Sequence, residues 1–298
     1  MIKFPFIIGL MTAAFLVAWS EPGQSGELTI IYTANSNGKL TACNCPNDPY
    51  GGLSERVTLI RDLRKKEQPF LLVDSGNMVS LFGDHELKAE CVARIMNLMK
   101  YDVAGVGRSE MYHGITSARA MSRTAKFPMI STTIVYKNDL KPVFQPHITK
   151  KINGVSVTIL ALGDSTFFLQ EIERDYDYKI LPVKNMYESI ASAIATQSDF
   201  IVVLSQMALE SNTSLLRHFP EIDLIVEGYG NKKYDPPITT PEGVIVSPGA
   251  GGEHVGLITL EKSDGNITVK RSELIPVLDI PEDNQAHSIV RYYYNHIK

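Results

Sequence analysis

Residues 28–38 read LTIIYTANSNG. The first five residues form an apolar, β-branched run that predicts a short strand, and the polar segment ending in Gly38 predicts a loop at the carboxyl end of that strand. Residues 53–66 then place Val57, Ile60 and Leu63 among charged residues, which is the spacing of an amphipathic helix. The folded part of the chain therefore begins with a strand, a loop and a helix.

The same alternation of strand and helix continues along most of the chain. After Pro241 the pattern becomes strand-rich, and helical spacing resumes from Asp283. Such alternation predicts helices layered over largely parallel sheets, and the strand-rich part predicts an added antiparallel portion. We predict an α/β fold, a layered sandwich, with residues 27–298 as a single domain. The predicted strands are 70–73, 103–106, 127–132, 155–162, 200–204, 224–226, 244–246, 255–260 and 267–274, and the further helices are 87–99, 117–124, 183–196 and 209–218.

Composition narrows the functional classes. The chain has 298 residues, of which 44% are hydrophobic and 21% charged, and this balance is typical of a globular protein. Its formal net charge of -4 gives no basic surface of the kind that nucleic-acid binding requires. We therefore expect no nucleic-acid partner.

The N-terminal segment has the features of an export signal. Lys3 precedes an apolar run over residues 6–19, and residues 18–20 offer a small-residue cleavage site. We predict a signal peptide over residues 1–20, a short linker over 21–26, and a periplasmic or extracellular location. The alternative is an uncleaved membrane anchor, although the apolar run is short for a span of about 20 residues.

Polar blocks follow five of the predicted strands. In open α/β sheets, loops at the carboxyl ends of strands meet and form the ligand site. We therefore expect these blocks to come together. They are TANSNG (33–38), DSGN (74–77), GRSE (107–110), LSQ (204–206) and EGYGN (227–231).

With GGLSER (51–56) and PGAGGEHVG (248–256), these blocks resemble the 5′-nucleotidase-type branch of the calcineurin-like metallophosphoesterases, over roughly residues 28–260. The resemblance covers the metallophosphatase domain of that family only. It implies an αββα-type sandwich with mixed sheets and, in the family, hydrolysis at a two-metal site. GDHE (83–86) looks like a family signature, but its position predicts a helix N-terminus, where acidic residues suit the helix dipole.

The resemblance also locates the family's metal ligands, and this chain has other residues there. The family reads Thr-Asn-Asp-x-His-Gly at residues 33–38, so two ligands correspond to Asn35 and Asn37. Its bridging aspartate corresponds to Asn77. The Asn-His pair of its Gly-Asn-His-Glu block and its later histidines correspond, in chain order, to Arg108, Ser109, Gln206, Tyr229 and Asn231.

These replacements argue against the inherited chemistry. Two divalent ions about 4 Å apart need charged or imidazole ligands to coexist, and amides are neutral. A guanidinium about 4 Å from a dication costs on the order of 8 kcal/mol at an effective dielectric constant of about 20. We therefore predict a pseudoenzyme without a metal cofactor, whose vestigial pocket presents neutral hydrogen-bonding groups and the charge of Arg108 to a small anion or polar ligand.

Other interpretations remain open. The amides and Tyr229 could satisfy one another and leave no ligand site. The chain could instead be a phosphoester or nucleotide hydrolase whose divalent metal is held by residues outside the family pattern, near Cys43, Cys45, His113 or His254. A third possibility is a structural or redox-partner interaction protein, for which the sequence names no partner.

The cysteines are a separate candidate site. Cys43 and Cys45 lie in the loop after the first strand, and Cys91 lies in a predicted helix. In an oxidising compartment a disulfide to one loop cysteine is possible, and free thiols or a metal-binding or redox pair are the alternatives. Cys91 could pair with either loop cysteine or be buried on its helix.

Overall fold

The computed structural model describes residues 26–42, 49–67, 69–81, 85–164 and 177–297. The predicted signal peptide, nearly all of the linker, Cys43 and Cys45 lie outside these residues. Within them, no helix combines the length and the apolar character needed to cross a membrane.

The first sheet has six strands in the order β14-β13-β1-β2-β3-β4. Strands β1 to β4 are parallel, while β13 pairs antiparallel with β1 and carries β14 at the edge. The predicted antiparallel addition to a parallel sheet is therefore confirmed. The strands are β1 (Gly26–Thr33), β2 (Leu71–Asp74), β3 (Val103–Gly105), β4 (Met129–Ile130), β13 (His254–Ser263) and β14 (Asn266–Pro276).

The second sheet also has six strands, in the order β11-β12-β10-β9-β7-β6. Its four central strands are parallel, and β11 and β6 pair antiparallel at its two edges. A separate pair joins β5 (Ile134–Tyr136) and β8 (Tyr178–Ile180). The strands of the second sheet are β6 (His147–Ile152), β7 (Val155–Gly163), β9 (Phe200–Gln206), β10 (Leu224–Glu227), β11 (Ile238–Thr239) and β12 (Val244–Val246).

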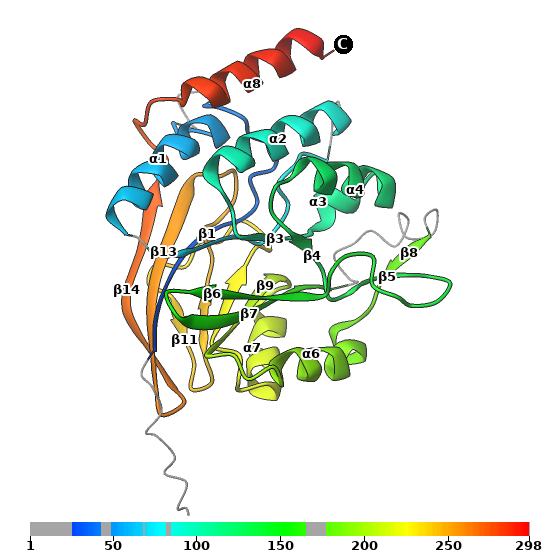
Figure 1. Ribbon diagram of the computed structural model, residues 1–298, viewed down its shortest axis with the longest axis vertical. Coiled ribbons are helices and arrows are strands. Elements are labelled where there is room, and N and C mark those ends of the chain that lie inside the picture. Colours follow the sequence, from blue (N-terminus) through cyan, green and yellow to red (C-terminus); the bar gives the residue numbers. More distant parts are fainter. Residues whose placement is uncertain (1–25, 43–48, 68, 82–84, 165–176, 298) are drawn as a thin grey trace, which may run out of the picture.

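Helices cover the outer face of each sheet, which gives four layers (Figure 1). Against the first sheet lie α1 (Leu53–Lys66), α2 (His85–Met99), α3 (Arg108–Met111), α4 (Gly114–Thr124) and α8 (Asn284–His296). Against the second lie the 3-10 turn η1 (Val183–Met186) and helices α6 (Tyr187–Ile194) and α7 (Leu209–His218). The αββα-type sandwich implied by the resemblance is confirmed.

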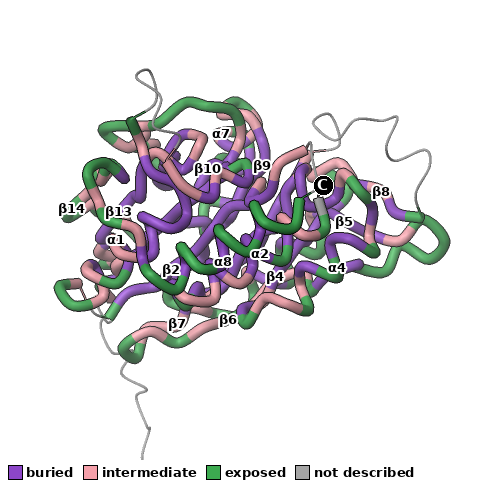
Figure 2. The backbone as a smooth tube through the Cα atoms, turned by 90° about the horizontal axis from the view of Figure 1, so that it is seen from above, coloured by how far each residue is buried: buried purple, intermediate pink, exposed green. Residues whose placement is uncertain are grey.

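Alternating residues along each strand divide the core. In β1, Ile30 and Tyr32 pack between the two sheets, whereas Ile31 packs under α1 and α2. A third cluster joins Val203 of β9 to Leu215 of α7. Figure 2 shows the buried residues concentrated in the strands, with exposed residues on loops and outward helix faces. The central strands β2, β3, β9, β10 and β12 are buried on both faces, so their side chains are mostly apolar, whereas the edge strands β6 and β14 are partly exposed and carry polar residues.

Some boundaries differ from the predictions. The predicted helix over 183–196 begins as η1, and α6 starts only at Tyr187, because Pro182 and Asn185 close a tight turn before it. The predicted strand over 127–132 contains only the two residues of β4. Glu86 lies in the first turn of α2, as predicted for the GDHE segment. The β5 and β8 pair was not predicted.

Candidate functional site

The loops after β1 and β2 are fastened to each other by their backbones. The backbone N–H groups of Asn35, Asn37 and Gly38 donate to the carbonyls of Gly76, Asn77 and Met78 at 2.9, 2.9 and 3.0 Å. Asn35, Asn37 and Asn77 have φ values of 49°, 49° and 57°, in the left-handed region that asparagine tolerates better than most residues. Asparagine at these positions therefore suits the loop backbone as well as the site.

Three of the predicted residues form one amide network. The side-chain nitrogen Nδ2 of Asn77 donates to Oδ1 of Asn35 at 3.0 Å and to Oε1 of Gln206 at 2.7 Å. Asn35 Nδ2 donates onward to the carbonyls of Gly230 and Gly249, and Gln206 Nε2 to the carbonyl of Ser75. Loops from both sheets are thus joined through side-chain amides, and each amide group has at least one protein partner.

Glu110 stabilises the backbone segments that carry the amide network. Its carboxylate is buried and accepts the backbone N–H groups of Asn77, Met78 and Gly107 at 3.0, 2.7 and 2.8 Å, with the hydroxyl of Ser109 at 2.8 Å. The backbone N–H of Ser109 in turn donates to Oδ1 of Asn77 at 3.0 Å. Glu110 therefore fixes the start of α3 against the β2 loop and orients the Asn77 amide.

Two further carboxylates near the loops are also held by hydrogen bonds. Asp74 is fully buried and accepts from Thr33 Oγ1 at 2.6 Å and from the backbone N–H of Gly76 at 2.8 Å, and burial raises its pKa to about 6. Glu227 accepts from Tyr234 Oη at 2.7 Å and from Asn212 Nδ2 at 2.8 Å, and burial raises its pKa as well. Both carboxylates therefore stabilise the strand-end loops by accepting hydrogen bonds from neighbouring residues.

Arg56, from the GGLSER segment, is a fully buried cation. Its Nη1 donates to Ser36 Oγ at 2.9 Å, whereas Nε and Nη2 have no hydrogen-bond partner among the described residues. The guanidinium lies directly against Gly252, where a Cβ would have no room. Its charge lowers the pKa of Asp74 against the larger effect of burial.

Arg108 opens α3 and is partly buried. Within the described part of the chain its guanidinium has no ion-pair or hydrogen-bond partner, and its Nε atom is shielded from solvent. The next residue, Ser109, contacts Asn77 directly. Arg108 is therefore next in sequence to a residue of the amide network, and its charge has no counter-charge among the described residues.

The remaining predicted residues are less closely connected to the network. Asn37 and Asn231 are exposed and Tyr229 is partly buried, so the network reaches the 229–231 segment through the carbonyl of Gly230 instead. That all eight positions line one pocket with their side chains stays a prediction.

Cys91 lies on α2 and is fully buried in the core cluster under the helices. This position agrees with the predicted alternative in which Cys91 is buried on its helix. Cys43 and Cys45 themselves lie outside the described residues, so a disulfide or redox role for the loop pair stays a prediction.

Sequence reasoning gave His254 little weight as a site residue. It is 7% exposed, its ring lies 5.3 Å from that of Tyr50, and its Nε2 is 3.3 Å from Nζ of Lys233. Burial lowers the pKa of His254, and the Lys233 ammonium lowers it further. The imidazole is therefore neutral at pH 7. In the sequence, the position of His254 within the Gly-rich segment 248–256 was the signal that could have indicated a site residue.

Comparisons with known proteins agree with this architecture. No family model matches the chain. Snake venom 5′-nucleotidase from Crotalus adamanteus is 25% identical over 245 residues, which cover 76% of this chain and 41% of that protein. Protein UshA from Yersinia enterocolitica is 24% identical, and the match covers 88% of this chain and 54% of that protein. The chain spans about half the length of these curated relatives.

Solved structures give the same fold. The calcineurin-like phosphoesterase YfkN from Bacillus subtilis has a TM-score of 0.74 at 17% identity, over 92% of this chain and 98% of that chain. The sulfate thiohydrolase SoxB from Thermus thermophilus has a TM-score of 0.77 at 16% identity, over 93% and 62%. These similarities support the resemblance of the chain to the 5′-nucleotidase-type branch of the calcineurin-like metallophosphoesterases.

The two-metal centre of this metallophosphoesterase family does not fit the residues present. The amide oxygens of Asn35, Asn77 and Gln206 already accept hydrogen bonds from N–H groups, and amides carry no charge to offset two dications. In the described residues, no group of three or more His, Cys, Asp or Glu side chains is placed to hold a metal ion. The nearby His254 contacts a lysine, which would repel a cation.

Proposed function

We propose that this chain is a non-catalytic metallophosphoesterase-fold protein of the cell envelope, in which the strand-end loops bind a small anion or polar molecule through Arg108. The observation that carries the proposal is the pairing of Asn35, Asn77 and Gln206 with one another beside a cation for which the described structure shows no counter-charge. In this proposal the three amides stabilise the loops, and Arg108 is the residue that binds the small anion or polar molecule.

The carboxylates support the non-catalytic interpretation. A metallohydrolase needs ionised ligands whose lone pairs face the reacting centre. Asp74, Glu110 and Glu227 are the buried acids of the five strand-end blocks, and each already accepts at least two hydrogen bonds from the protein. Redirecting any of them to a metal would leave buried N–H or O–H donors without acceptors, at about 1 to 3 kcal/mol for each donor.

The arginine favours an anion. A guanidinium presents a rigid fork of donors that matches carboxylate or phosphate oxygens, and partial burial reduces the screening of its charge by solvent. The predicted signal peptide supports placement in the envelope. Phosphate, sulfate and the phosphate group of a nucleotide share the chemistry that Arg108 would recognise.

The decisive experiment measures anion binding by the purified protein. We expect millimolar phosphate or sulfate to raise the melting temperature of the wild type, and the Arg108→Ala variant to lose most of that increase. Arg123→Ala, which removes an exposed arginine on α4, is the matched control and should behave as the wild type. An equal increase in all three proteins, or none in the wild type, would refute the pocket.

The similarity to 5′-nucleotidases supports a second candidate, a hydrolase that uses metal ligands outside the family pattern. Metal analysis of the purified protein, together with assays on a nucleotide and a generic phosphodiester, tests it directly. Our proposal predicts no stoichiometric metal and no turnover above background. Turnover that a chelator abolishes and Mn²⁺ restores would replace it with the hydrolase.

A further inference from the structure

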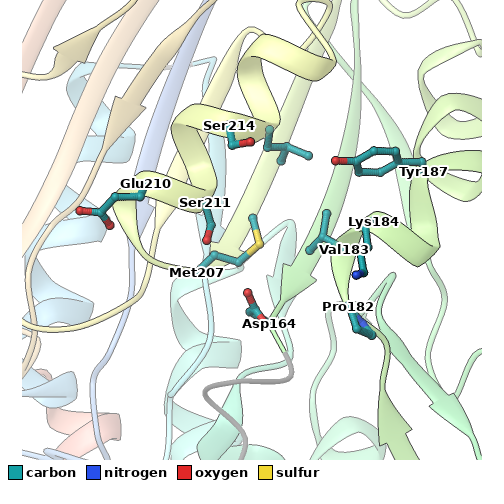
Figure 3. Close-up of a pocket in the computed structure, with 10 residues that line it drawn as sticks. Asp164, Pro182, Val183, Lys184, Tyr187, Met207, Glu210, Ser211 and Ser214 are labelled. Atoms are coloured by element: carbon teal, nitrogen blue, oxygen red, sulfur yellow. The ribbon is translucent and has the colours of Figure 1, made fainter.

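A cavity of about 380 Å³ lies on the other side of the second sheet from the amide network. It opens between η1 and α6 on one side and α7 on the other, above the carboxyl ends of β7 and β9 (Figure 3). Gln206 contributes its side chain to the amide network, and the next residue, Met207, lines the cavity. The cavity is therefore adjacent to the first site along the chain but faces a different layer of the molecule.

Several polar groups of the cavity wall have no partner among the residues that the structure describes. Among the described residues, no hydrogen bond or ion pair is formed by the side chains of Ser211, Ser214, Lys184 or Glu210, or by the hydroxyl of Tyr187. Thr213, on the same helix, behaves differently because its hydroxyl donates to the carbonyl of Leu209 at 2.8 Å. The cavity thus presents both donors and acceptors that a ligand can use.

The aromatic wall is held in place. The Tyr187 ring stacks on His218 with 4.0 Å between ring centroids and meets Phe219 edge to face at 5.2 Å. Met207 and Leu215 are buried and supply apolar surface beneath it. Because these side chains are already ordered, a ligand that contacts them loses little free energy in ordering the site.

The charges of the lining exclude an anion as the preferred ligand. Asp164 and Glu210 are acidic and Lys184 is basic, so the lining carries a formal charge of -1, unlike the uncompensated Arg108. A volume of 380 Å³ lies within the range of small-molecule sites, which run from about 300 to 1,000 Å³. We propose that this cavity binds an uncharged polyhydroxylated molecule of about monosaccharide size, whose hydroxyls both donate and accept and whose C–H faces contact Tyr187 and Met207.

The test uses saturation-transfer NMR on the full-length protein with D-glucose and with myo-inositol as probes. We expect saturation of at least one probe by the wild type. Ser214→Leu, which fills the cavity, should weaken binding at least tenfold, and Tyr187→Phe, which keeps the ring but removes its hydroxyl, should weaken it threefold or more. Ser192→Leu places the same side chain on the exposed face of α6 and should change affinity less than twofold.

Absence of binding by both probes overturns the proposal, as does wild-type affinity in both Ser214→Leu and Tyr187→Phe. Competition by inorganic phosphate at equal concentration also overturns it, because the probes would then occupy the Arg108 site. Melting temperatures of the variants show whether each is folded. Since the helix surface at Ser214 is exposed, we expect Ser214→Leu to fold normally.

Discussion

Asn77 Nδ2 lies 2.7 Å from Gln206 Oε1, and this hydrogen bond joins the end of β2 in one sheet to the end of β9 in the other. The same nitrogen bonds Asn35 Oδ1, so both of its hydrogens are used within the protein. In a two-metal enzyme the corresponding groups would face ions. Here they hold the two sheets together at the edge where their loops meet.

The amide network predicts a measurable contribution to stability. Asn77→Gly removes three hydrogen bonds while glycine accommodates the φ of 57°, so we expect a loss of about 2 to 3 kcal/mol in the free energy of unfolding. Asn37→Gly is the matched control, since Asn37 has a φ of 49° and an exposed side chain, and it should lose less than about 1 kcal/mol. Urea unfolding measures both. Equal losses would show that backbone entropy, and not the amide, determines the effect.

Because of Asp74, we expect the free energy of unfolding to fall as pH rises through the weakly acidic range. Its folded-state pKa of about 6 is above that of an unfolded aspartate, so between about pH 4 and 6 the folded state holds more protons than the unfolded state. Stability from this group is therefore complete below about pH 4 and is lost as pH rises through 6. We expect the Asp74→Asn variant to lack this decline. The wild-type minus variant difference in urea midpoint, measured from pH 4 to 7, isolates Asp74 from other carboxylates, and a flat difference contradicts the prediction.

Arg56 should shift that same titration. Since its charge lowers the pKa of Asp74, Arg56→Met should move the Asp74-dependent decline to higher pH. Removing this charge should also leave the ionised Asp74 carboxylate without its nearby cation, so we expect Arg56→Met to lower the free energy of unfolding at pH 7. A double-mutant cycle with Asp74→Asn measures the coupling between the two residues. Strictly additive losses would mean that Arg56 acts through packing alone.

Glu227 depends on the Tyr234 hydroxyl. Tyr234→Phe removes a 2.7 Å hydrogen bond from a carboxylate whose pKa is already raised by burial, so we expect a loss of about 1 to 2 kcal/mol at pH 7 and a smaller loss at pH 4. Tyr294→Phe, at a side chain that is 56% exposed, should leave the free energy of unfolding unchanged. Chemical denaturation at the two pH values distinguishes loss of the hydrogen bond from loss of packing, which would be independent of pH.

Local sequence patterns predicted the layers well, because apolar periodicity reflects which face each strand and helix buries. Val57, Ile60 and Leu63 face the core as their spacing indicated. The short strands β5 and β8 escaped prediction because three residues contain too little periodicity, and β5 pairs with β8 across more than 40 residues of chain.

The candidate site was predictable in outline only. Strand ends and family spacing brought Asn35, Asn77 and Gln206 into one constellation, and the structure places them in hydrogen-bond contact. Which amide donates to which depends on side-chain directions and on carbonyls such as those of Gly230 and Gly249, and no pattern in a single sequence encodes these. The outward position of Asn37 arises in the same way.

Gln206 and Met207 are consecutive, yet one belongs to the amide network between the sheets and the other to the cavity beneath α6 and α7. Adjacent residues of an extended chain point to opposite faces, so insertion or deletion of one residue within β9 would exchange their directions. The amide would then enter the apolar layer, and the thioether would replace it beside Asn77. The length of β9 is therefore constrained by the residues packed on both faces of the second sheet. We expect this segment to tolerate substitutions better than insertions or deletions.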